Sequence, residues 1–199
     1  MFSWLFLRGR CLGCKTKIPA QYPLMELGNA ALWALCAWRF EFDWALLLIG
    51  CLTMSVLLII AVIDGRTGEI PPGLNVALGV LGAAAAFFGG AGVLAHVIGA
   101  FALSVPLLLV YLASKGKAIG GGDIKFLCAA GLLLGWKLVL LAFVAACVLG
   151  TAVHIVRMLI SGAGRVLRLG PYLAAGVALT MLFGETAIDW YVSLFWKGI

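Results

Sequence analysis

Long uncharged apolar runs are the feature of this sequence that most restricts its fold. Two of them, at 44–63 and 93–113, read WALLLIGCLTMSVLLIIAVI and VLAHVIGAFALSVPLLLVYLA. Each is close to the ~20 residues that an α-helix needs to cross the hydrocarbon core of a bilayer. The chain is 64% hydrophobic and only 11% charged, which is far from the composition of soluble domains. We therefore expect an integral membrane protein.

The apolar runs and the glycines, prolines and charges between them predict an all-α polytopic protein with about seven transmembrane helices. The predicted spans are 24–39, 44–63, 73–89, 93–113, 123–134, 137–160 and 171–184. The final piece, 185–199, mixes acids with tryptophans and suits an interfacial helix end. We divide the chain into a short N-terminal segment, 1–23, and a transmembrane domain, 24–199.

The basic residues predict an orientation, because Lys and Arg in short loops favour the cytoplasmic side. With a cytoplasmic N-terminal segment, eleven of the fourteen Lys and Arg residues fall on that side. Those eleven are Arg8, Arg10, Lys15, Lys17, Arg66, Lys115, Lys117, Lys125, Arg157, Arg165 and Arg168. The net charge of +6 then reflects topology and contact with anionic membrane lipids, and we expect no nucleic-acid partner.

Two aspartates stand at the ends of predicted spans. Asp64 in AVIDGRTGEIPPGLN ends the second span, and Asp123 in IGGGDIKFLCAAG begins the fifth, so both fall at the predicted cytoplasmic boundary. Ionisable residues at membrane depth usually face a protein interior or a wet cavity, which makes them functional candidates. The alternative for each acid taken singly is a structural role at a helix end.

Four segments resemble, in order, the type IV prepilin peptidase family of Gly-x-Gly-Asp intramembrane aspartic proteases. They are WLFLRGRCLGCKTKIPAQYPLMELGNA (4–30), DGRTGEIP (64–71), GGGDIK (120–125) and LGPYLAAG (169–176). The resemblance implies an endopeptidase that removes the basic leader from type IV prepilins, or from pseudopilins of type II secretion. It also implies a location in the bacterial inner membrane, with the active site at the cytoplasmic face.

Asp64 and Asp123 are the predicted catalytic residues. Peptide hydrolysis needs a base to activate water and an acid to protonate the carbonyl oxygen, and two close carboxyl groups that share one proton supply both. We assign the base to Asp123, at a helix start, and the acid to Asp64, at a helix end, although such a pair titrates as one unit. The neighbouring residues that we assign to substrate positioning are Gly120, Gly121, Gly122, Lys125, Glu69 and Pro71.

These neighbours also have simpler interpretations. The three glycines allow an irregular backbone beside which an extended peptide could lie. Lys125 serves equally as a topology signal, and Glu69 either receives the basic leader or pairs with an arginine. His96 is interpreted as a histidine satisfied within its own helix, and Pro106 as a kink in the fourth span.

Cys11 and Cys14 have the Cys-x-x-Cys spacing of zinc ligands, but a structural zinc site needs four ligands. The resemblance implies a short form without the first helix and first Cys pair of longer members, so we expect two free thiols, with zinc as the alternative. Proteolysis requires no cofactor, and S-adenosylmethionine is expected only if methylation of the new N-terminus is retained. The sequence does not determine the oligomeric state.

Two other functions are compatible with paired acids. A small proton-coupled transporter would use them as a proton relay, but it would be expected to hold them near the membrane midplane, often in broken helices of two matching halves. An inactive relative that serves only in assembly would most simply have lost one aspartate, whereas both are present.

Overall fold

The computed structural model describes residues 4, 9–41, 43–90, 92–161 and 168–196. The helices are α2 (Gln21–Phe40), α3 (Trp44–Thr67), α4 (Pro72–Phe88), α5 (Val93–Ala102), α6 (Ser104–Ala113), α7 (Gly121–Ser161) and α8 (Gly170–Trp196). Within those ranges the only strand-like pairing is one isolated antiparallel bridge between Arg10 and Lys17. The predicted all-α fold class is therefore confirmed for the described part of the chain.

Local sequence signals place the ends of α3 and the start of α4. The Asp43 side chain caps α3 by accepting a hydrogen bond from the Leu46 amide at 3.0 Å. Gly68, with φ of 75°, ends the helix, and its amide donates to the Asp64 carbonyl at 2.8 Å. Pro72 then opens α4, where its missing N–H costs nothing. Asp64 thus lies inside the last turn of α3, and the predicted helix end at residue 63 was too early.

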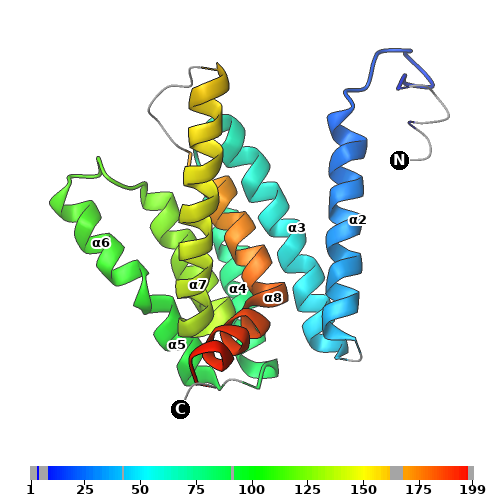
Figure 1. Cartoon of the computed structure of the whole chain (residues 1–199). Helices are drawn as coiled ribbons and strands as arrows, with labels where there is room; N and C mark the ends of the chain where they lie inside the picture. Colours follow the sequence, from blue (N-terminus) through cyan, green and yellow to red (C-terminus); the bar gives the residue numbers. More distant parts are fainter. Residues whose placement is uncertain (1–3, 5–8, 42, 91, 162–167, 197–199) are drawn as a thin grey trace.

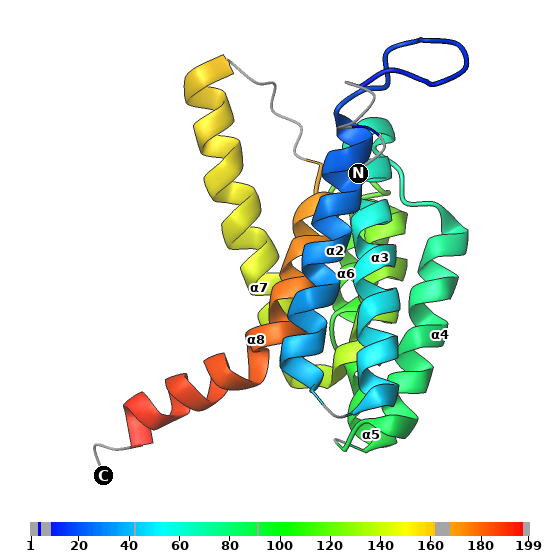
Figure 2. The ribbon, with the colours of Figure 1, turned by 90° about the vertical axis from the view of Figure 1, so that its right-hand side faces the viewer.

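Two of the apolar segments are interrupted. The helix pair α5 and α6 breaks at Leu103, three residues before Pro106, where the Ser104 hydroxyl donates to the Ala100 carbonyl at 2.5 Å. The predicted kink in this segment is confirmed. Helix α7 is interrupted at Gly135, with φ of 78° and ψ of 173°, which falls between the predicted spans 123–134 and 137–160. The part after Gly135, yellow in Figure 2, leans away from the other helices.

In the described part of the chain, four helical segments are long and apolar enough to cross a membrane: Trp44–Thr67, Val93–Ala113, Gly121–Ile160 and Gly170–Leu194. Helix α4 is apolar but shorter. Large apolar side chains such as Phe87 and Leu159, 77% and 82% exposed, lie on the outside, as a lipid environment favours. The chain is an all-α membrane protein.

Glycines let the helices approach closely. A Cβ on Gly99 of α5 would overlap the backbone of Gly131 and Gly135 in α7, and one on Gly82 of α4 would lie 2.8 Å from the Leu133 amide nitrogen. Gly176 of α8 meets the backbone at Ala142 in the same way. Small residues at such contacts are typical of helix packing in membranes, where no hydrophobic effect draws the helices together. Helices α4, α5 and α8 consequently pack around α7, while α2 lies on the flank beside α3 (Figure 1).

The bundle has two chemically different ends. At the aspartate end, α3 ends and α4, α7 and α8 begin, and this end carries Asp64 and Asp123. At the opposite, tryptophan end, α2 and α4 end, α3 and α5 begin, and α7 is interrupted. This end carries Trp38, Trp44 and Trp136, which are 64%, 76% and 41% exposed.

The two chain ends add one feature each. The described part of the N-terminal segment forms a hairpin that precedes α2, and Arg66 at the end of α3 donates a hydrogen bond to Gln21 at the start of α2. The hairpin therefore stands at the aspartate end. The predicted last span and the final piece form one helix, α8, whose last turns run away from the bundle (Figure 2), while residues 197–199 lie outside the described part.

Candidate active site

Asp64 is held in the interior by the start of α8. Its side chain is only 5% exposed, and Oδ2 has no hydrogen-bond partner among the described residues. A Cβ on Gly170, the first residue of α8, would overlap the Asp64 carboxyl group, so only glycine lets the two helices meet here. The Gly170 amide faces the carboxyl group without completing a hydrogen bond of normal geometry to Oδ2. Asp64 thus keeps an acceptor for a proton or a ligand.

Asp123 lies in the first turn of α7 and is half-buried. A Cβ on Gly120 would lie 3.0 Å from Asp123 Oδ2, and the Gly120 backbone amide faces the carboxylate. Backbone N–H groups at a helix start favour negative charge at this position. The carboxyl groups of Asp123 and Asp64 lie close enough for their charges to interact. Two acids that are 59 positions apart in the sequence therefore share one site.

The loop between α3 and α4 closes one side of this site. Ile70 is buried at 8% exposure, and a Cβ on Gly122 would lie 3.6 Å from Ile70 Cβ. The loop thus packs directly on the first turn of α7. Pro71 is the N-cap residue of α4.

The other predicted positioning residues are distributed less simply. Only Gly120 precedes the helix, whereas Gly121 and Gly122 belong to the first turn of α7, so the expected irregular loop is shorter than the sequence indicates. Glu69 and Lys125 are both exposed. The Glu69 amide donates to the Thr67 hydroxyl at 3.3 Å, which orders the turn after α3.

Two residues near the acids, Gly170 and Arg168, escaped sequence reasoning. Gly170 belongs to a segment recognised by resemblance, but nothing in the sequence shows that it faces Asp64. Arg168 donates to the Gly65 carbonyl and interacts electrostatically with Asp64, whereas the sequence assigned it only to topology. Asn75, 7% exposed in the first turn of α4, leaves both amide atoms without a partner among the described residues. A buried amide of this kind needs a water or ligand partner.

The Cys11 and Cys14 pair lies on the N-terminal hairpin. The Lys15 amide donates to the Cys11 carbonyl, which closes a tight turn around the two thiols. The hydroxyl of Thr16, 2.8 Å from Cys14 Sγ, and the Thr16 backbone amide stabilise the thiolate and lower the pKa of Cys14 to about 7. Tetrahedral zinc requires four ligands. The described residues place no third His, Cys, Asp or Glu beside this pair, so they do not make a complete zinc site.

His96 differs from its expected state. Its Nδ1 lies 2.9 Å from the Leu132 carbonyl on α7, so its contact joins two helices and does not stay within its own. The Nε2 atom is buried and has no partner among the described residues. His96 lies at the tryptophan end, far from the two acids along α5 and α7.

The fold and the site together define the class of protein. It is an all-α membrane protein with two interacting carboxyl groups at one end of its helix bundle. The chain belongs to the type IV leader peptidase family, whose model matches residues 51–155 and thus covers both aspartates. A second model, the bacterial peptidase A24 N-terminal domain, matches residues 1–40, including the Cys pair. The family resemblance seen in the sequence is confirmed.

Relatives named "Prepilin leader peptidase/N-methyltransferase" match most of this chain. The protein from Burkholderia pseudomallei strain 1026b is 38% identical over 194 residues, which cover 92% of this chain and 62% of the relative. The relative from Aeromonas hydrophila is 34% identical over 98% of this chain and 69% of its own length. This chain therefore spans only 62% of the length of the Burkholderia relative. No solved structure matches.

Proposed function

We propose that this chain is an intramembrane aspartic endopeptidase that removes the basic leader from type IV prepilins or from pseudopilins of type II secretion. The observation that carries the proposal is the meeting of Asp64 from α3 and Asp123 from α7, both inside the region matched by the leader peptidase model. The substrate class rests on the family and on the names of the relatives.

The mechanism follows from the two acids. One carboxylate takes a proton from a water molecule while the other, protonated, donates a proton to the peptide carbonyl oxygen. Two close carboxyl groups cannot both ionise comfortably, so the pair holds both protonation states at once. Both acids face helix starts, Asp123 at α7 and Asp64 at α8, so the simple contrast between a helix start and a helix end does not separate their roles. Assignment of the base to Asp123 rests on its greater exposure, which gives water access.

The proposed substrate-positioning residues are those next to the two acids in the sequence: Gly120, Gly121, Gly122, Lys125, Glu69 and Pro71. Gly120 leaves backbone beside Asp123 open to an extended peptide, because any Cβ there would crowd the carboxylate. Glu69 is exposed, so its negative charge can pair with the positive charge of the leader. The leader of the proposed substrate lies outside the membrane.

The proposed topology has seven spans, with the aspartate end at the cytoplasmic face of the bacterial inner membrane. Helices α2, α3, α4, α5 with α6, the two parts of α7, and α8 would each cross once. Helix α7 supports two crossings, because its 41 residues would extend about 60 Å, twice the hydrocarbon thickness. The N-terminal hairpin at the aspartate end would then also be cytoplasmic.

The proposed proteolysis uses no cofactor, since the two acids supply the proton transfers. Zinc at Cys11 and Cys14 would need ligands from outside the described residues. The name of the relatives includes "N-methyltransferase". Methylation of the new N-terminus with S-adenosylmethionine is a separate proposal for this chain.

The test is co-expression with a prepilin, followed by N-terminal sequencing and mass measurement of the mature product. We expect removal of the leader by the wild-type chain and none by Asp64→Asn. Asp43→Asn is the matched control, because Asn also caps helices and Asp43 lies at the opposite end. Uncleaved prepilin with the wild-type chain, or equal cleavage by Asp64→Asn, would overturn the proposal. The mass of the product shows separately whether its N-terminus is methylated.

A further inference from the structure

A cavity of about 250 Å³ opens at the tryptophan end of the bundle. Its walls are mostly apolar and come from six helices, α2, α3, α4, α5, α7 and α8, with Phe40, Ile49, Leu133 and Met181 among them. A second cavity of about 560 Å³ shares Leu134, Leu138 and Glu185 with the first, so the two adjoin. Neither is lined by Asp64 or Asp123.

His96 lines the first cavity and carries a buried hydrogen-bond acceptor. The Leu132 carbonyl can only accept, so the 2.9 Å contact assigns the imidazole proton to Nδ1. In the neutral ring Nε2 then presents a lone pair. His96 is 5% exposed and Nε2 has no partner in the described part of the chain, although its residue lines the cavity. A buried acceptor of this kind favours a ligand that brings an N–H or O–H donor.

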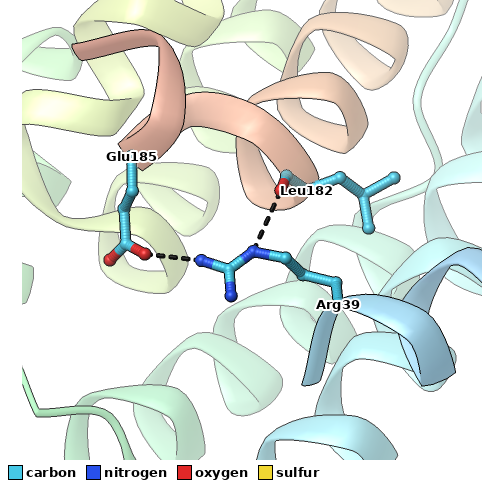
Figure 3. A network of polar contacts seen from close by, with 3 residues as sticks. All are labelled: Arg39, Leu182 and Glu185. Atoms are coloured by element: carbon cyan, nitrogen blue, oxygen red, sulfur yellow. Dashed lines mark hydrogen bonds and ion pairs between the residues drawn. The ribbon is translucent and has the colours of Figure 1, made fainter. Parts of the chain in front are cut away.

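Charges of both signs surround the mouth. Arg39 donates through Nη2 to Glu185 Oε2 at 2.5 Å and through Nε to the Leu182 carbonyl at 3.0 Å, as Figure 3 shows. The adjoining cavity adds Lys137 and Asp189. Two cations and two carboxylates at one mouth make its formal charge zero. That charge pattern suits a zwitterion better than an anion or a cation.

The position of the cavity mouth relative to the membrane surface indicates the source of the ligand. Trp38 and Trp136 are exposed at this end, and tryptophans concentrate where the hydrocarbon core meets the headgroups. Lys137 Nζ lies 5.6 Å from the centre of a Trp136 ring, at the same level. The cavity therefore opens beside lipid headgroups, and its apolar walls continue toward the hydrocarbon core.

We propose that this cavity binds phosphatidylethanolamine, with the lipid phosphate at Arg39 and an N–H group of the lipid ammonium at His96 Nε2. The ammonium of this lipid supplies the N–H donor that the buried imidazole lacks. Phosphatidylcholine carries the same charges but has no N–H group, and phosphatidylglycerol has a net negative charge. Comparison of phosphatidylethanolamine with phosphatidylcholine therefore tests the hydrogen bond to His96. Comparison with phosphatidylglycerol tests the electrostatics of the rim.

The test is a titration of the purified full chain in detergent with each dioleoyl lipid, with bound lipid counted by native mass spectrometry. We expect one phosphatidylethanolamine to bind about tenfold more tightly than phosphatidylcholine or phosphatidylglycerol, because a hydrogen bond to a charged group is worth about that factor. In His96→Asn the amide nitrogen can still donate to Leu132, but the Nε2 acceptor is gone. This variant should bind phosphatidylethanolamine and phosphatidylcholine equally.

Arg39→Gln keeps the proposal testable if His96→Asn does not fold. It removes a cation that both zwitterionic lipids use, so both should weaken together and the preference should persist. Asp64→Asn should bind lipid as the wild type does, which makes the result independent of proteolysis. Equal binding of the two zwitterionic lipids to the wild type, a preference that survives in His96→Asn, or tighter binding of phosphatidylglycerol would each overturn the proposal.

Discussion

Asp64 at one end of the bundle and His96 at the other are both buried and both keep an atom without a partner among the described residues, but their surroundings are opposite. Asp64 and His96 are both 5% exposed. Asp64 lies beside a second acid, with Arg168 bound to the neighbouring Gly65 carbonyl. His96 is fixed by a backbone carbonyl and faces an apolar cavity with a balanced rim.

This difference separates the proposed site for chemistry from the proposed site for binding. Two carboxyl groups in one site can exchange protons with a substrate, because their charges interact. A single imidazole whose Nδ1 proton is directed at the Leu132 carbonyl presents one fixed acceptor, Nε2. Burial alone therefore says little about function, and the neighbours of the buried group decide it.

Replacement of either acid should give the largest effect. We expect Asp64→Asn and Asp123→Asn each to lower the cleavage rate about 10³-fold or more, since residues that act as a unit lose nearly everything when one is removed. The double variant should be no worse than either single one. The measurement is cleavage of a purified prepilin in detergent, with correct folding checked by thermal melting. Substantial activity in one single variant would break the comparison, because one acid would then suffice.

A substitution that crowds the Asp64 carboxyl group should give the next largest loss of cleavage rate. In Gly170→Ala the new Cβ would overlap the Asp64 carboxyl group, and displacement of a catalytic group by about 1 Å can cost about 10²-fold in rate. Gly73→Ala is the matched control, because a Cβ at that position would have no described atom within 4 Å beyond its chain neighbours and its own helix backbone. The two variants are compared by cleavage rate and by melting temperature. If both cleave at the same rate, the start of α8 does not position Asp64.

Close packing beneath His96 should affect stability more than activity. In Gly99→Ala the Cβ would overlap the Gly131 backbone, and overpacking of this kind costs about 1–3 kcal/mol. Gly28→Ala in α2, which has open space around it, should change stability by less than about 1 kcal/mol. Thermal melting in detergent measures both. A melting temperature of Gly99→Ala equal to that of the wild type would show that α5 is not held against α7 as described.

The smallest expected effect is a shift in the pH dependence of Cys14 alkylation, which also probes the structure at the aspartate end. Because the Thr16 hydroxyl and amide lower its pKa to about 7, its alkylation rate should rise through pH 7 as the thiolate forms. In Thr16→Val the midpoint should move to higher pH, since the hydroxyl that stabilises the thiolate is lost. Mass spectrometry of the alkylated peptide follows the rate. A wild-type midpoint near that of an ordinary thiol, unchanged in the variant, would contradict the hairpin geometry.

The helices and both acids could be predicted from the sequence. Apolar runs fix helices in a membrane because every backbone hydrogen bond must be made internally. The break at Gly135 and the interruption before Pro106 were readable for the same reason, since Gly and Pro weaken a helix wherever it lies. Helix ends were less accurate: α3 runs past Asp64 to Thr67, and α7 starts at Gly121.

The neighbours of each buried group could not be predicted. Gly170 against Asp64 and Leu132 against His96 join residues more than thirty positions apart, and the sequence carries no signal for such contacts. His96 was expected to be satisfied within its helix, because the sequence cannot show that α5 lies so close to α7 that its ring reaches a carbonyl there.

The sequence by itself determined that this chain is a helical membrane protein with two acids at helix ends, because hydropathy and motif spacing act locally along the chain. Only the tertiary structure decided that the acids share a site and that His96 faces a cavity. Both depend on glycine contacts that set how closely the helices pack, and packing distance is a property of two surfaces together.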